Sequence, residues 1–214
     1  MANTVYATHR ENQREWILEV AEDLFIQKGI EQVTIGEIAN ASRLTRATIY
    51  KYFSNKEEMA QELFITVTKS WMDRNAHEVW TFQGNGYERL EKFLSSFFAS
   101  LFQNPREAGF IAELNYLYAK HWSSEMFVET MLVNLRDDRK FVLDSIQRGI
   151  EDGSLRTDMD AELMLAAFFN FLSGMISRFG EMGNKVEAEF GISSQNIFSQ
   201  INRIFLDGLK PPPG

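Results

Sequence analysis

Helical periodicity with almost no interruption is the feature that most limits how this chain can fold. Apolar residues recur at spacings of three and four, as in Ile17, Val20, Ala21, Leu24 and Phe25, and this spacing gives a helix one apolar face. Three of the four prolines are consecutive near the C-terminal end, so the residue that most disrupts helices is nearly absent from the interior. No alternating pattern of strand length competes. We therefore predict an all-α protein.

Helix starts are marked by capping boxes, in which a Ser or Thr side chain caps the helix and a Glu three residues later reaches back. The pairs that fit are Thr8 with Glu11, Thr34 with Glu37, and Ser54 with Glu57. Thr45 can cap a further helix of about two turns, from Arg46 to Phe53. Helices this short are marginal alone and need tertiary packing. We therefore expect residues 8–53 to form a compact three-helix unit, with the next helix leading out of it.

Longer helices are expected after Ser54, separated by Gly, Pro and Ser breaks. We place them near 54–81, 87–103, 105–120, 125–151, 160–182 and 195–209. Together with the three preceding helices, this makes about nine. We accordingly expect two domains, an N-terminal unit over residues 1–56 and a C-terminal helical unit over residues 57–214.

The net charge of −8 is unevenly distributed along the 214 residues. Residues 1–56 hold seven Lys/Arg and seven Asp/Glu, whereas residues 57–214 hold 15 and 23 and supply the whole excess of negative charge. Residues 42–56 nevertheless contain four basic residues and no acidic one: Arg43, Arg46, Lys51 and Lys56. A polyanion would be repelled by most of the surface, so it can dock only where these cations lie.

Several classes of protein are excluded by what the sequence lacks. The chain has no cysteine, which excludes disulfides and cysteine-based metal sites. The N-terminal residues contain no apolar signal segment. The longest apolar run, residues 163–169, is far shorter than the roughly 20 residues that span a bilayer. We expect a cytoplasmic protein without cofactor, metal or membrane partner.

The third predicted helix has two different faces. Ile49 and Phe53 are four residues apart and point to the core, whereas Ala47, Thr48 and Lys51 point outward. A helix that enters the major groove needs a small residue for close approach, cations, and donors for base edges. A solvated basic face on an ordinary helix would explain the cations alone. Two short helices joined by a turn, with capped ends beside them, favour a helix-turn-helix.

Residues 14–60 resemble the N-terminal DNA-binding domain of the TetR/AcrR family of bacterial transcriptional regulators. "AEDLFIQKG" resembles the end of that family's first helix, "TIGEIANAS" its second helix and turn, and "TRATIYKYFSNKEEM" its recognition helix and the start of its fourth. The spacing Tyr50-x-Tyr52-Phe53-x-x-Lys56 is specific to this pattern. The resemblance implies a ligand-responsive repressor that binds a near-palindromic operator as a homodimer and is released by a small-molecule effector.

The resemblance also implies contacts to double-stranded DNA at ten positions. Those that would face bases or nearby phosphates are Arg46, Ala47, Thr48 and Lys51. Those that would contact phosphate are Thr34, Arg43, Thr45, Tyr50, Tyr52 and Lys56. Ala47 stands where the family usually has glycine or a similar small residue. The resemblance therefore leaves open which bases Arg46 would contact.

In the C-terminal unit the resemblance implies an effector pocket and a dimer interface. The pocket candidates are Trp71, Trp80, Phe98, Phe102, Tyr116, Tyr118 and Trp122. The interface candidates are Leu163, Ala167, Asn170, Phe171, Gly174, Ile197, Ile201, Ile204 and Phe205. Packing within a single chain would give both sets the same helical spacing, so it stays an alternative for each.

Two other functions were weighed against a regulator. A di-metal enzyme in a helical bundle needs Glu-x-x-His pairs, but Tyr6, Arg74 and Tyr118 stand three residues before the three histidines. Neither a nucleophile elbow nor a phosphate-binding loop is present, so we do not expect an enzyme. A helical small-molecule-binding protein leaves the basic segment unexplained. A transcriptional activator of the same fold stays open.

Overall fold

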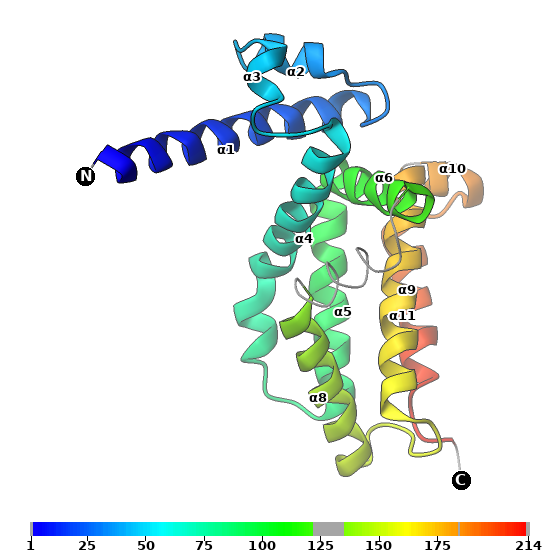
Figure 1. Ribbon diagram of the computed structural model, residues 1–214. Coiled ribbons are helices and arrows are strands. Elements are labelled where there is room, and N and C mark those ends of the chain that lie inside the picture. The colour runs from blue at the N-terminus through cyan, green and yellow to red at the C-terminus, as the bar shows by residue number, and fades with distance from the viewer. Residues whose placement is uncertain (1, 122–134, 184, 213–214) are drawn as a thin grey trace. The chain divides into compact units, whose positions relative to one another are not determined.

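The computed structural model describes residues 2–121, 135–183 and 185–212, and its regular elements over this range are all helices (Figure 1). The all-α prediction is therefore confirmed. The chain divides into two compact units, Met1–Val67 and Thr68–Gly214. The division falls within the fourth helix, eleven residues beyond the predicted domain boundary at 56. Helix labels follow Figure 1.

The first unit is built from three helices and the beginning of a fourth: α1 (Ala2–Lys28), α2 (Ile35–Ala41), α3 (Arg46–Ile49) and α4 (Lys56–Trp80). Its core receives Ile17, Ala21 and Phe25 from the periodic stripe of α1. Ile49 and Phe53, which the sequence assigns to the core, are 0% and 1% exposed. The short helices thus gain from burial the stability that they lack alone.

The second unit contains the rest of α4 and six further described helices: α5 (Gly86–Gln103), α6 (Pro105–His121), α8 (Arg136–Asp152), α9 (Ala161–Met182), α10 (Lys185–Phe190) and α11 (Ser194–Asp207). In Figure 1, α5, α8, α9 and α11 run along one another, and α6 lies across α9. Phenylalanine rings fill the interior, where Phe98 stacks on Phe198 at 3.5 Å and Phe93 meets the edge of Phe168 at 5.7 Å.

Two predicted helix starts are wrong. The structure begins α1 at Ala2, so Thr8 lies inside that helix and cannot cap it. The fourth helix is capped one residue later than predicted: the Glu58 N–H donates to Asn55 Oδ1 at 2.8 Å, and the Ser54 N–H donates to Glu58 Oε2 at 2.7 Å. Because Asn55 and Glu58 have the same spacing as Ser54 and Glu57, the sequence alone does not separate the two registers.

The helices themselves agree more closely with expectation. The ends of α4, α5, α6, α9 and α11 lie within two residues of the predicted ones. The predicted helix 125–151 corresponds over its described part to α8, and residues 125–134 lie outside the described residues. Regular α3 ends at Ile49, four residues before the predicted end, and single turns carry the chain on to Phe53. The short helix α10, between Gly183 and Gly191, was not predicted.

Small residues bring α6 and α9 into backbone contact. A Cβ atom on Gly180 of α9 would lie 2.5 Å from the Ala108 carbonyl oxygen and 2.9 Å from the Ala112 Cβ of α6. A Cβ atom on Gly109 of α6 would lie 3.4 Å from the Gly180 carbonyl oxygen, which is an ordinary contact. The crossing therefore depends on the missing side chain at Gly180 and tolerates a methyl group at Gly109.

Among the described helices, α9 has the length and hydropathy of a membrane-spanning segment, judged by these two properties only. Within the second unit, Met164, Leu165 and Phe168 of α9 are buried in the core. Core helices of globular proteins commonly pass the same test, so this property does not indicate a membrane protein.

We predict that Gly180→Ala lowers the free energy of unfolding by about 1–3 kcal/mol, because an added methyl group overpacks the α6–α9 crossing. Gly109→Ala at the same crossing should be neutral or stabilising by up to about 1 kcal/mol, because alanine favours the helix. Urea unfolding followed by circular dichroism, at one fixed protein concentration, measures both. Equal stability of the two variants would contradict the close contact.

Candidate functional site

The start of α2 is fixed by a complete capping box. The Glu37 N–H donates to Thr34 Oγ1 at 3.2 Å, and the Thr34 N–H donates to Glu37 Oε2 at 2.9 Å, which confirms the predicted pair. The Lys28 ammonium donates to Glu37 Oε1 at 2.8 Å, which links the end of α1 to the first turn of α2. The hydrogen bond from Lys28, followed by those from Thr34, lowers the pKa of Glu37 to about 2.

Lys56 ties the segment between α1 and α2 to the beginning of α4. Its Nζ donates to the carbonyl oxygens of Ile30, Glu31 and Val33 at 2.8, 2.9 and 3.1 Å. An ammonium group has three hydrogens, so all three donors are used inside the unit. The predicted phosphate contact of Lys56 stays a prediction, and the structure gives its side chain an internal role that the sequence did not suggest.

The turn between α2 and α3 is held by a hydrogen bond from α1 and by the cap of α3. Arg43 has a φ of 58°, a left-handed conformation that is uncommon outside glycine. The Trp16 indole N–H of α1 donates to the Ser42 carbonyl oxygen at 3.2 Å, which anchors the turn to α1. Thr45 then caps α3, as predicted, by accepting the Thr48 N–H at 3.1 Å.

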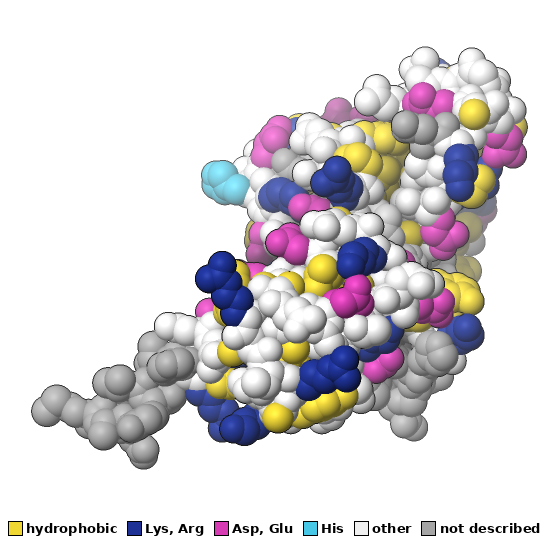
Figure 2. Space-filling view, turned by 90° about the horizontal axis from the view of Figure 1, so that it is seen from above, with side chains coloured by type: hydrophobic (Ala, Val, Ile, Leu, Met, Phe, Trp, Pro, Cys, Tyr) yellow, Lys and Arg dark blue, Asp and Glu magenta, His cyan; other side chains and the backbone are white. Residues whose placement is uncertain are grey.

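Most of the ten predicted DNA-contact residues reach the surface. Thr34, Arg43, Thr45, Arg46, Ala47, Tyr50 and Lys51 are exposed, and Thr48, Tyr52 and Lys56 are half-buried. Within the part of the chain that the structure describes, Arg43, Arg46 and Lys51 form no ion pair. In Figure 2, which views the molecule of Figure 1 from above, Lys and Arg side chains are exposed on this face, with Asp and Glu side chains interspersed among them. This surface can attract a polyanion.

Two of these side chains are held by residues that the sequence did not single out. The Tyr52 hydroxyl donates to Gln13 Oε1 of α1 at 3.0 Å. The Arg46 guanidinium lies against Gly36 of α2, where a Cβ atom would be 2.5 Å from Arg46 Nη2. The first contact joins the turn after α3 to α1, and the second joins α3 to α2, so no local pattern could have revealed them.

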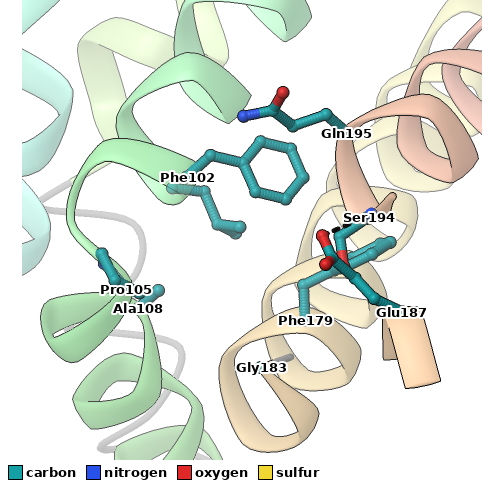
Figure 3. A pocket seen from close by; sticks show the side chains of 9 residues that line it. Phe102, Pro105, Ala108, Phe179, Gly183, Glu187, Ser194 and Gln195 are labelled. Atoms are coloured by element: carbon teal, nitrogen blue, oxygen red, sulfur yellow. Dashed lines mark hydrogen bonds between the residues drawn. The ribbon is translucent and has the colours of Figure 1, made fainter. Parts of the chain in front are cut away.

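A cavity of about 200 Å³ lies in the second unit, where the end of α5, the first turn of α6, the end of α9, and α10 and α11 come together (Figure 3). We call it the corner pocket, and its lining residues are Leu101, Phe102, Pro105, Ala108, Phe179, Gly183, Glu187, Ser194 and Gln195. In Figure 3, Phe102 reaches into the space from α5, and Ser194 and Gln195 approach it from α11.

Of the predicted pocket residues, Phe102 lines this cavity. Phe98 is buried in the ring cluster instead, and Trp80 and Tyr116 are 40% and 53% exposed. Trp122 lies outside the described residues, and the side chains of Trp71 and Tyr118 are outside the described set as well. The lining also includes Glu187 of α10 and Ser194 and Gln195 of α11, which are not aromatic and were therefore not among the predicted pocket residues.

The predicted interface residues lie on outward faces of α9 and α11. Leu163, Ala167, Asn170, Gly174 and Ile204 are exposed, and Phe171, Ile197, Ile201 and Phe205 are half-buried. Phe171 and Phe205 stack on each other at 4.1 Å with nearly parallel rings. An apolar surface that stays partly exposed in one chain is typical of a protein interface.

A helix-turn-helix with a cationic outward face, followed by a helical unit with a cavity, defines a DNA-binding transcriptional regulator. Residues 17–63 match the family model described as bacterial regulatory proteins, tetR family. The transcriptional repressor KstR2 of Mycobacterium tuberculosis is 27% identical over 154 residues, covering 72% of this chain and 74% of that protein. The N-terminal segment is thus similar to the DNA-binding part of the TetR family, and the relatives that match most of the chain are transcriptional regulators rather than enzymes.

Two solved structures share the fold at low sequence identity. A structure of the ketosteroid transcriptional regulator KstR2 of M. tuberculosis gives a TM-score of 0.61 at 22% identity, over 92% of this chain and 94% of that chain. FadR from Bacillus subtilis, solved in complex with stearoyl-CoA, gives a TM-score of 0.66 at 18% sequence identity. The match covers 91% of this chain and 98% of the FadR chain.

We predict that Glu37 titrates with a pKa of about 2, against an ordinary value of 4.5. Because the folded pKa is lowered, the stability that this carboxylate contributes is present above the ordinary value and is lost as the pH falls from it towards about 2. Carboxyl-carbon NMR of Glu37 follows the titration directly. In the Lys28→Met variant the pKa should rise, and an unchanged pKa would remove Lys28 as the main cause.

Proposed function

We propose that the protein is a repressor that binds a near-palindromic DNA operator as a homodimer in the cytoplasm and is released by a small-molecule effector. Residues 1–56 would form the DNA-binding domain, and residues 57–214 would bind the effector and the second subunit. The observation that carries the proposal is the exposed cationic surface of Arg46 and Lys51, which form no ion pair with the residues that the structure describes and are held on a capped and hydrogen-bonded frame. The name of KstR2, a transcriptional repressor, supports repression over activation.

The chemistry of this face suits both parts of DNA recognition. Arg46, Ala47, Thr48 and Lys51 would approach base edges and nearby phosphates, since cations and hydroxyls pair with the acceptors of the major groove. The remaining predicted contacts would hold phosphates and set the position of the helix on the duplex. The acidic remainder of the chain would repel DNA and so restrict binding to this surface.

A dimer would give the operator its symmetry. A two-fold interface through the outward faces of α9 and α11 would present two copies of α3, and paired recognition helices of this type read half-sites about one helical turn apart. An effector that binds one arrangement of the pair more tightly would shift the population away from the arrangement that fits DNA.

We predict that Arg46→Ala and Lys51→Ala each weaken operator binding by about 1–3 kcal/mol if the side chain reads a base. A side chain that holds a phosphate should instead lower the slope of log K against log salt by about 0.9. Fluorescence anisotropy with the DNA upstream of the protein's own gene, compared with a scrambled duplex, measures both.

The matched control is Lys140→Ala, which removes an exposed cation from α8. It should leave operator affinity unchanged, and all three variants should keep the helical circular dichroism of the parent. Wild-type affinity in both the Arg46→Ala and the Lys51→Ala variant would remove α3 and the turn after it from recognition and favour a ligand-binding protein without a DNA role.

Ile204→Lys tests the interface, because Ile204 is 72% exposed on the outward side of α11. A buried lysine without a partner would be strongly unfavourable, so we expect the dimer to dissociate and operator affinity to fall with it. Ser199→Lys, five residues earlier and about 140° around the helix, should leave the dimer intact. Sedimentation equilibrium measures both, and a dimeric Ile204→Lys protein would place the interface elsewhere.

A further inference from the structure

The corner pocket has an apolar side and a polar side. Leu101, Phe102, Pro105, Ala108 and Phe179 form the apolar side, with the Phe102 and Phe179 rings in edge contact at 5.8 Å. Glu187, Ser194 and Gln195 come from α10 and α11 and lie across the space from Phe102, Pro105 and Ala108, with Phe179 beside Glu187 and Ser194 (Figure 3). Such an arrangement suits an amphiphile, whose apolar body would be buried while its polar group stays near the mouth.

The charge of the polar side decides which amphiphile fits. Glu187 is the one charged residue among the nine that line the pocket. The Ser194 N–H donates to its Oε1 at 2.9 Å, the bond drawn as a dashed line in Figure 3. This bond orients the carboxylate and leaves its second oxygen with acceptor capacity. The Ser194 hydroxyl and the Gln195 amide oxygen can also accept hydrogen bonds.

We infer that the corner pocket binds a small organic cation, namely a protonated primary amine on a short apolar or aromatic body. An ammonium group brings three donors to a site with three side-chain acceptors, and its charge pairs with Glu187. Phosphate or carboxylate groups would instead face Glu187 without a lysine or arginine in the lining. The anionic head of an acyl-CoA therefore does not fit this pocket.

The volume limits the size of the ligand. At about 200 Å³ the cavity is smaller than the roughly 300–1,000 Å³ of sites for drug-sized molecules. One aromatic ring with a two-carbon arm and an ammonium group is a suitable size. The ring would lie beside Phe102 and Phe179, and the ammonium would reach Glu187.

The position of the pocket suggests how such a ligand would act. Pro105 and Ala108 belong to the first turn of α6, and Phe179 and Gly183 lie at the end of α9. A bound molecule would therefore contact both helices close to their crossing at Gly180. Its binding would favour the arrangement of α6 and α9 that shapes the pocket best. This regulatory meaning, unlike the binding itself, rests on the proposed function.

The test uses 2-phenylethylammonium chloride and sodium 3-phenylpropionate, which are similar in size and opposite in charge. Isothermal titration calorimetry on the full chain should show saturable binding of the amine and affinity at least about tenfold lower for the carboxylate. Glu187→Gln should lower amine affinity by about tenfold or more. Glu181→Gln makes the same charge change at an exposed residue of α9 outside the lining, and should stay within about twofold of the parent.

A second variant separates the loss of charge in Glu187→Gln from a change in the shape of the pocket. Gln195→Lys places a cation at the polar side on an exposed position, so it should abolish amine binding and favour the carboxylate. No saturable binding of the amine up to about 10 mM, equal affinity for both probes, or full amine affinity in Glu187→Gln would each overturn the inference.

Operator affinity, measured with and without the amine, separates this inference from the proposed function. Amine binding that changes operator affinity supports both. Amine binding that leaves operator affinity unchanged supports the pocket and removes it as the effector site. If the parent protein shows no preference for any operator while the amine still binds, the proposed function fails and the pocket stands.

Discussion

The ammonium group of Lys56 holds together the frame that supports α2 and α3. The carbonyls of Ile30, Glu31 and Val33 follow the end of α1, and Lys56 binds all three from the first turn of α4. A charged donor is well suited to this place, because each bond to an ionised group is stronger than one between neutral groups. The segment thus fixed ends at Thr34, whose capping box starts α2. The placement of α2 and α3 therefore depends on a cation for which the sequence predicts a DNA contact.

Local patterns predicted the helices well and their tertiary contacts poorly. Apolar spacing and the breaks between helices depend on neighbouring residues, so the ends of α4, α5, α6, α9 and α11 were predicted to within about two residues. The start of α1 was not, because the helix continues past Thr8 to Ala2. Thr34 and Thr45 cap as expected for the same reason. By contrast, the bond between Tyr52 and Gln13 spans 39 positions, and its partners carry no mark in the sequence. The shift from Ser54 to Asn55 shows the limit within the local patterns, because both residues satisfy the same rule.

The second unit shows why a cavity is harder to predict than a core. Helical spacing indicates that an aromatic residue is buried, but it does not distinguish packing against a neighbour from lining an empty space. Phe98 and Phe102 lie one turn apart on α5, yet one stacks on Phe198 and the other lines the corner pocket. The one charged residue of that lining, Glu187, comes from α10, a helix of six residues that the sequence did not predict. The charge of the pocket is therefore determined by α10, the helix with the weakest pattern in the sequence.

The small residues of α9 leave that helix little freedom to change. One side meets the backbone of α6 at Gly180, another buries Leu165 and Phe168, and a third presents Leu163 and Ala167 outward. A substitution at Gly180, or at Leu165 or Phe168, therefore disturbs a contact inside the unit. The α10 segment has no such restriction, since it is short and largely exposed yet contributes Glu187 to the pocket. A new ligand preference could consequently evolve by substitutions in α10, because they change the charge of the pocket without disturbing the packing of the long helices.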